Sequence, residues 1–161
     1  ARRARLSVDV PAGIADEQRI RLAGRGHAGE AGGPAGDLYV LVRVQEDARF
    51  TRDGDDLVTV IDLPAPDAAL GTTVEVETLD GKEQLRIEAG TQPDTELTLR
   101  GKGMPSLRHR GRGNHRVVVN VVTPRRLSKR QRELLEELRG TLTDENLREE
   151  GPSFFARRRR R

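Results

Sequence analysis

The sequence carries an internal repeat. When it is shifted by 77 residues, residues 6–50 align with residues 83–127 without a gap, and ten of the 45 pairs are identical. Because a glycine at a fixed place marks a turn or a close backbone approach, shared glycines indicate a shared backbone path. The repeat therefore predicts two similar units. Most identities are glycine or valine: Gly13/Gly90, Gly24/Gly101, Gly26/Gly103, Gly36/Gly113, Val40/Val117, Val42/Val119 and Val44/Val121.

Both copies show the alternation of apolar and polar residues that is typical of half-buried strands. An Asp80-Gly81 pair between two alternating runs predicts a tight hairpin, and Pro66–Gly71 predicts one helical turn closed by glycine. The expected fold is therefore mainly all-β. The expected strands are 6–10, 20–22, 38–44, 57–63, 73–77, 82–88 and 117–121.

The two copies differ in the length of sequence that precedes them. Residues 50–82 lead into the second copy, whereas only residues 1–5 stand before the first, and the offset places Ala1 opposite Thr78. The first unit thus lacks about two strands, which leaves unpaired strand edges. We expect it to be truncated at this point, or completed by another chain.

A helix is predicted after the second copy. Ser128 and Gln131 have the spacing of a capping box, Gly140 is expected to end the helix, and the segment from Thr141 is polar and resembles a flexible tail. Two roles for the leucine stripe stay open: packing on the second β unit, or dimerisation. The stripe consists of Leu127, Leu134, Leu135 and Leu138.

Residues for catalysis or metal binding are not evident. The chain has no cysteine, which excludes disulfides, thiolate metal sites and cysteine nucleophiles. Gly24–Gly29 matches G-x-G-x-x-G, but the glycine-rich sequence after it cannot open a helix, so it predicts a turn. Asp53–Asp56 likewise predicts a tight turn and not a calcium loop. We expect His27, His109 and His115 to be solvated or turn-bound, and we expect no enzyme activity, metal or cofactor in this chain.

Charge leaves one alternative function. The net charge is +3, and five arginines form the run 157–161. Such a run can bind phosphates by charge alone, so a basic β-rich nucleic-acid-binding protein is the alternative. Interleaved charges elsewhere and only 2% aromatic residues favour a solvated tail. No apolar run reaches the ~20 residues of a membrane span, and the absence of cysteine fits the cytoplasm.

Several stretches together resemble the C-terminal region of the DnaJ co-chaperones. They cover Leu6 to Leu138 in order and include Val10-Pro-Ala-Gly-Ile14, Arg19–Gly24, Gly36–Val40, Phe50–Leu57, Thr78–Gly81 and Arg100–Met104. The resemblance implies two consecutive β-sandwich or barrel-like domains that bind unfolded clients, the first truncated, followed by a dimerising helix. The implied division is 1–47 for the rest of the first peptide-binding domain, 48–123 for the second domain, 124–140 for the dimerisation helix and 141–161 for a basic tail.

The resemblance also implies sites and partners. Client-peptide binding falls on Leu6, Val8, Val10 and Phe50, although Phe50 can equally be ordinary core. Dimerisation falls on Leu127, Leu134, Leu135 and Leu138, giving a homodimer. The family inserts a zinc module at the hairpin opposite Ala1, so zinc is expected only upstream of this chain. The implied function is a co-chaperone for protein folding and stress response that delivers clients to a DnaK-type partner, although these residues do not include the family's His-Pro-Asp signature.

Overall fold

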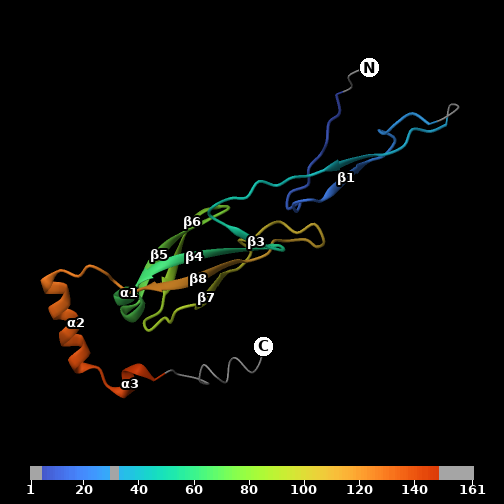
Figure 1. The fold of residues 1–161 in the computed structure, drawn as a ribbon. Helices are drawn as coiled ribbons and strands as arrows, with labels where there is room; N and C mark the ends of the chain where they lie inside the picture. The colour runs from blue at the N-terminus through green and yellow to red at the C-terminus, as the bar shows by residue number, and fades with distance from the viewer. Residues whose placement is uncertain (1–4, 30–32, 149–161) are drawn as a thin grey trace. The chain divides into compact units, whose positions relative to one another are not determined.

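A computed structural model describes residues 5–29 and 33–148. The described chain is mainly β, with short helices (Figure 1). It divides into two compact units, residues 1–123 and 124–161. The elements are β1 (Arg19–Leu22), β2 (Leu38–Leu41), β3 (Thr51–Asp53), β4 (Asp56–Pro64), α1 (Ala65–Leu70), β5 (Thr72–Thr78), β6 (Gly81–Ile87), β7 (Glu96–Leu99), β8 (His115–Val122), α2 (Lys129–Thr141) and α3 (Asp144–Leu147).

The described residues of the larger unit form three sheets. β1 and β2 form an antiparallel pair, β5 and β6 form a hairpin, and the third sheet has the order β3-β4-β8-β7. β4 and β8 lie side by side and parallel at its centre, whereas β3 and β7 pair antiparallel at its edges (Figure 1). None of the described sheets closes into a barrel.

The core lies almost entirely in residues 57–119, that is, in the second copy of the repeat and in the segment that leads into it. Leu63, Ala68, Ile87 and Val119 form one buried cluster, so α1, the β5–β6 hairpin and the larger sheet pack together. Gly71 ends α1 with a positive φ of 79°, as the sequence indicated. Of the first copy's described residues, only Ile14 is a buried apolar residue.

The repeat is confirmed in the backbone. β1 pairs with β2 in the same register as β7 pairs with β8, because Arg19↔Leu41 and Glu96↔Val118 are counterparts under the 77-residue offset. The hydrogen bonds match as well. Gly26 N donates to Gly36 O at 2.7 Å and Gly103 N to Gly113 O at 2.9 Å. Val42 N donates to Gln18 O at 2.8 Å, and Val119 N to Thr95 O at 2.9 Å.

The strand expected at 6–10 is not formed. Residues 81–87, close counterparts of this segment, make β6 by pairing with β5. Under the offset the counterparts of β5 would precede residue 2, so residues 5–10 have no partner strand among the described residues. Without a neighbouring ladder, the alternating sequence alone does not make a strand.

The strand expected at 38–44 is shorter than predicted. β2 ends at Leu41, whereas its counterpart β8 continues to Val122. Just before β1, Glu17 has a positive φ of 61°, which turns the chain away from β2. Asp94 has a φ of 62° at the equivalent place before β7. β8 still continues because β4 pairs with its other edge as far as Val122, whereas β2 has no such neighbour in the described part of the chain.

The smaller unit contains the predicted helix. α2 begins with the expected capping box: Gln131 N donates to Ser128 Oγ at 3.2 Å, and Ser128 N donates to Gln131 Oε1 at 2.8 Å. The helix runs through Gly140 to Thr141, so the prediction that Gly140 ends it is wrong. Glycine keeps a helical conformation here, and Leu142 N still donates to Leu138 O. The segment expected to be a flexible tail contains α3, and the arginine run 157–161 lies outside the described residues.

Candidate functional site

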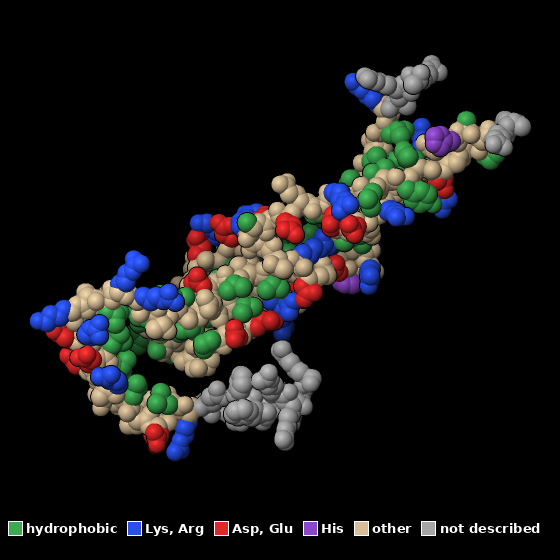
Figure 2. Space-filling view, viewed as in Figure 1, with side chains coloured by type: hydrophobic (Ala, Val, Ile, Leu, Met, Phe, Trp, Pro, Cys, Tyr) green, Lys and Arg blue, Asp and Glu red, His purple; other side chains and the backbone are tan. Residues whose placement is uncertain are grey.

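The first copy presents much apolar surface. Five of its side chains are exposed by 40–59%: Leu6, Val10, Tyr39, Leu41 and Val44. Hydrophobic side chains are visible around the β1–β2 pair in the space-filling view (Figure 2). Exposed apolar side chains that gather in one part of a protein are typical of an interaction site.

One edge of β2 is available for pairing. Val42 exchanges backbone hydrogen bonds with Gln18 and Glu17, so the alternation of an antiparallel pair points the N–H and C=O groups of Tyr39 and Leu41 away from β1. Their counterparts in β8 face β4. Among the described residues no strand lies on this edge of β2, so an extended chain can add there by main-chain hydrogen bonds.

The inner face of the same pair is less covered than its counterpart. Leu38 and Val40 are only half-buried, whereas His115 and Val117 at the equivalent positions have no exposed surface. The apolar side chains of β2 are therefore incompletely covered on both faces of the strand.

Phe50 lies in a different setting. Its ring makes an edge-to-face contact with His115, with centroids 5.6 Å apart and planes at 74°, and the Arg49 guanidinium lies 5.0 Å from the ring centroid. Arg49 also forms hydrogen bonds to Asp47, which lower the pKa of that carboxyl to about 2. Phe50 is half-buried, so part of the ring stays accessible.

His115 is not solvated or turn-bound, and that prediction is wrong. It is fully buried, with Nε2 2.7 Å from Thr59 Oγ1, while Nδ1 has no hydrogen-bond partner among the described residues. Thr59 Oγ1 donates to Arg49 O at 3.3 Å, so the ring is best placed to donate from Nε2. Burial lowers the pKa of His115 because the charged ring would lose its water.

The predicted client-binding residues fall into two groups. Leu6, Val8 and Val10 share one unpaired segment, and Phe50 begins the second β unit. No hydrogen bond or ring contact joins them in the described structure. Sequence analysis missed Tyr39 and Leu41 as surface residues. Their signal was available, because the run Leu-Tyr-Val-Leu is apolar on both faces of the strand.

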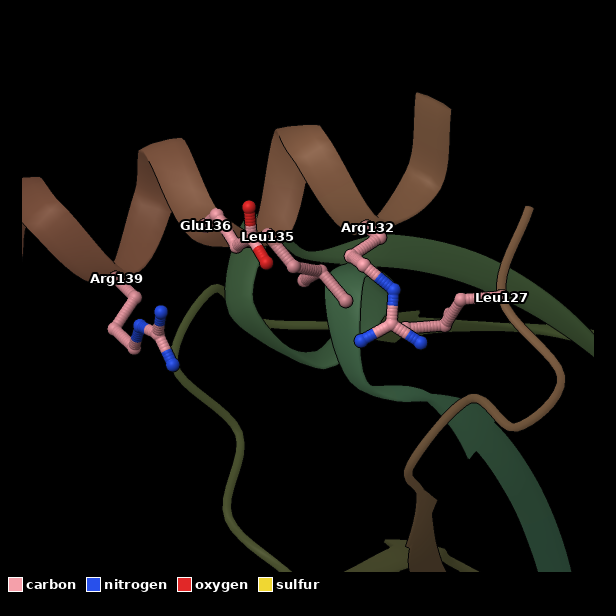
Figure 3. Close-up of a pocket in the computed structure, with 5 residues that line it drawn as sticks. All are labelled: Leu127, Arg132, Leu135, Glu136 and Arg139. Atoms are coloured by element: carbon pink, nitrogen blue, oxygen red, sulfur yellow. The ribbon is translucent and has the colours of Figure 1, made fainter. Parts of the chain in front are cut away.

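α2 carries three of the four leucines of the predicted stripe on its surface, and Leu127 lies just before the helix. No residue of the helix is buried, and Leu134, Leu135 and Leu138 are exposed by 46%, 38% and 52%. Figure 3 shows Arg132 extending from α2 toward Leu127, where a shallow hollow forms. The hollow is lined by Leu127, Arg132, Leu135, Glu136 and Arg139. Its lining thus combines two leucines with three charged side chains.

The described residues hold no group of three or more His, Asp or Glu side chains suited to a metal ion. In the same ranges, no helix has the length and apolar character needed to cross a membrane. The surfaces described above can bind by strand addition and apolar contact.

Comparison with known proteins agrees with this geometry. Residues 1–124 match the family model described as DnaJ C terminal domain. "Chaperone protein DnaJ" of Bacillus cytotoxicus is 51% identical over 139 residues, which are 86% of this chain and 38% of that protein. "Chaperone protein DnaJ" of Halalkalibacterium halodurans is 46% identical over 159 residues, 99% of this chain and 43% of that protein. "Chaperone protein DnaJ 1" of Corynebacterium efficiens is 53% identical over 135 residues, 83% and 36% respectively.

A repeated backbone path in a mainly β unit, followed by a helix with exposed leucines, defines a β-repeat protein. The chain belongs to the DnaJ family and corresponds to its C-terminal region. It spans about two fifths of the length of the curated relatives it matches.

Proposed function

We propose that this chain is the client-binding and dimerisation part of a non-enzymatic co-chaperone that hands unfolded proteins to a DnaK-type chaperone in the cytoplasm. The family supports the chaperone role. The observation that carries client binding is the difference in cover between the two copies. The first copy leaves apolar side chains and a strand edge accessible, and these are the two features by which an extended, unfolded segment is held.

Leu6, Val8 and Val10 supply one side of the proposed client surface. Each fully buried aliphatic side chain contributes roughly 1.5–3 kcal/mol, so a client held by a few partial contacts binds weakly and exchanges readily. Weak, reversible binding suits a protein that must release its client to a partner.

A paired substitution tests this surface. The double variant Leu6→Asp/Val10→Asp should weaken binding of a permanently unfolded chain, such as reduced and carboxymethylated α-lactalbumin, by about tenfold in fluorescence anisotropy. The matched control is Val60→Asp/Val122→Asp, because Val60 and Val122 are exposed by 62% and 41% in the second β unit, close to the 59% and 40% of Val10 and Leu6. Equal loss of binding in both variants would contradict a site in the first copy.

Phe50 supplies the proposed second wall. Phe50→Ala should weaken client binding and leave the oligomeric state unchanged. Because the ring also contacts His115, a lower melting temperature is expected too. Phe50→Leu copies the counterpart Leu127 and keeps most of the volume, so it separates client binding from packing. If both variants bind the unfolded chain as the parent does, Phe50 is not part of the site.

Dimerisation is proposed for Leu127, Leu134, Leu135 and Leu138. Three leucines of the stripe are exposed on α2 and Leu127 is half-buried before the helix, so burial against a second copy would remove their apolar surface from water. A chain ending at Arg126 should sediment as a monomer, and Leu135→Asp/Leu138→Asp should do the same without a deletion. Leu147→Asp is the matched control, since Leu147 is 71% exposed on α3 outside the stripe. A parent chain that is monomeric, or a stripe variant that stays dimeric, contradicts the proposal.

A further inference from the structure

The turn at residues 11–14 contacts the second β unit in a way that its repeat counterpart does not copy. Gly13 and Gly90 are equivalent, and both have a positive φ, 90° and 79°. A Cβ at Gly13 would overlap the carbonyl oxygen of Pro105, whereas a Cβ at Gly90 would meet nothing within 4 Å. Gly13 is therefore packed against the loop between β7 and β8. In the first copy the shared turn thus also forms a contact between distant segments.

Arg52, on β3 of the second unit, holds the same turn from another side. Its Nη2 donates to Gly13 O at 2.6 Å and its Nη1 to Ile14 O at 2.7 Å, while its Nε donates to Gly54 O at 2.8 Å. The planar guanidinium thus joins the backbone of the first copy to the β3–β4 turn. Ile14, between these contacts, is only 9% exposed.

The covalent connection between the two copies provides little of this constraint. Residues 43–49 contain no strand or helix, and their only isolated bridge among the described residues joins Asp47 to Phe50. A connection of this kind allows the two units to reorient. The contacts of Arg52 and Gly13 oppose such movement, because the Arg52 guanidinium holds two backbone carbonyls of the first copy and Gly13 packs on the backbone of Pro105.

We propose that Arg52 is a positioning residue: with the close contact of Gly13 on Pro105, its guanidinium locks the first β unit in one orientation on the second. The inference deepens the proposed function, on which it rests, because the first unit carries the proposed client surface. The lock would fix how that surface is presented relative to the rest of the chain.

The absence of cysteine makes the lock directly measurable. Cysteines for spin labels can be placed at Arg25 and Glu88, which are both exposed and lie one in each copy of the repeat. Pulsed electron spin resonance on the full 161-residue chain should give one narrow distance distribution. Arg52→Ala should broaden the distribution at least about twofold. Arg52→Lys should give an intermediate width, because an ammonium can bond one of the carbonyls but cannot reach all three at once. Gly13→Ala should broaden the distribution by disturbing the contact with Pro105.

Two controls keep the result interpretable. Arg86→Ala removes an exposed arginine that pairs with Glu88 and, among the described residues, makes no hydrogen bond or ion pair with the first copy. For this control the second spin label is placed at Glu83 and not at Glu88, and the distribution should stay narrow. Slow amide exchange in β8 shows that the second unit stays folded in every variant. A broad distribution in the parent, or distributions as narrow as the parent in both Arg52→Ala and Gly13→Ala, would overturn the lock. The distances are measured without client, so failure of the lock and failure of client binding are separate results.

Discussion

The two copies of the repeat have the same backbone frame and opposite surroundings. Gly24 N donates to Asp37 Oδ1 at 3.0 Å, and Gly101 N donates to Asn114 Oδ1 at 3.1 Å, so even this side-chain contact of the loop is repeated. Yet Val117 is fully buried and its counterpart Val40 is half-exposed. The difference lies in what covers the frame.

The comparison shows that the backbone path of the repeat and the burial of its side chains are set by different residues. Glycines and a few hydrogen bonds set the path of the hairpin in both copies. Burial in the second copy comes largely from β4, α1 and β5, which precede its half of the repeat in the sequence. The first copy has no described equivalents of these elements, and several of its apolar residues are exposed.

The largest effect is expected at a pair of equivalent glycines. A Cβ at Gly113 would overlap the carbonyl oxygen of Asp55, whereas a Cβ at Gly36 would have only His27 O near it, at 3.9 Å. Gly113→Ala should therefore lower the free energy of unfolding by about 3 kcal/mol, and Gly36→Ala by less than about 1 kcal/mol. Urea unfolding followed by circular dichroism measures both. Similar losses would mean that Gly36 is covered too.

A smaller difference is expected for the equivalent valines. Val117→Ala removes two methyl groups from a fully buried site, which should cost about 2–3 kcal/mol of unfolding free energy. Val40→Ala should cost less than about 1 kcal/mol, since its site is already half-open. The same urea titration compares them, and a larger loss for Val40→Ala would reverse the assignment of core and surface.

The smallest effect concerns His115, whose counterpart is Leu38. Burial lowers its pKa in the folded chain, so below the ordinary value of about 6.5 the unfolded state binds more protons than the folded state. Stability should accordingly fall as the pH drops from 7 through 6.5 toward the lowered folded pKa. His115→Leu should remove this part of the pH dependence. Thermal melting between pH 7.5 and 5.5 tests it, and an unchanged slope in the variant would exclude His115 as its source.

The sequence predicted much of the fold because its signals were local. The glycine pattern gave the repeat and its register, Asp80-Gly81 gave the β5–β6 hairpin, and Ser128 with Gln131 gave the start of α2. The strand at 6–10 failed because pairing depends on a neighbour that alternation cannot report. β2 was overestimated for the same reason.

The candidate site was less predictable. The burial of His115 depends on Phe50 and Thr59, which are far away in the sequence, and the role of Arg52 depends on Gly13 and Ile14. Such contacts leave no periodic pattern. The surface positions of Leu6 and Val10 are consistent with the client-binding proposal, and the predicted roles of all the site residues, like the four predicted domain ranges, stay predictions.

Amide hydrogen exchange by NMR tests the central claim most directly, since Val42 and Val119 make the same hydrogen bond in the two copies. In the free chain, Val42 should exchange at least about a hundredfold faster than Val119, because only the second copy is covered. Adding reduced, carboxymethylated α-lactalbumin should slow exchange at Tyr39, Leu41 and Val42 and leave Val119 unchanged. Equal slow exchange at Val42 and Val119 in the free chain, or protection by the client at Val119 alone, would contradict the account.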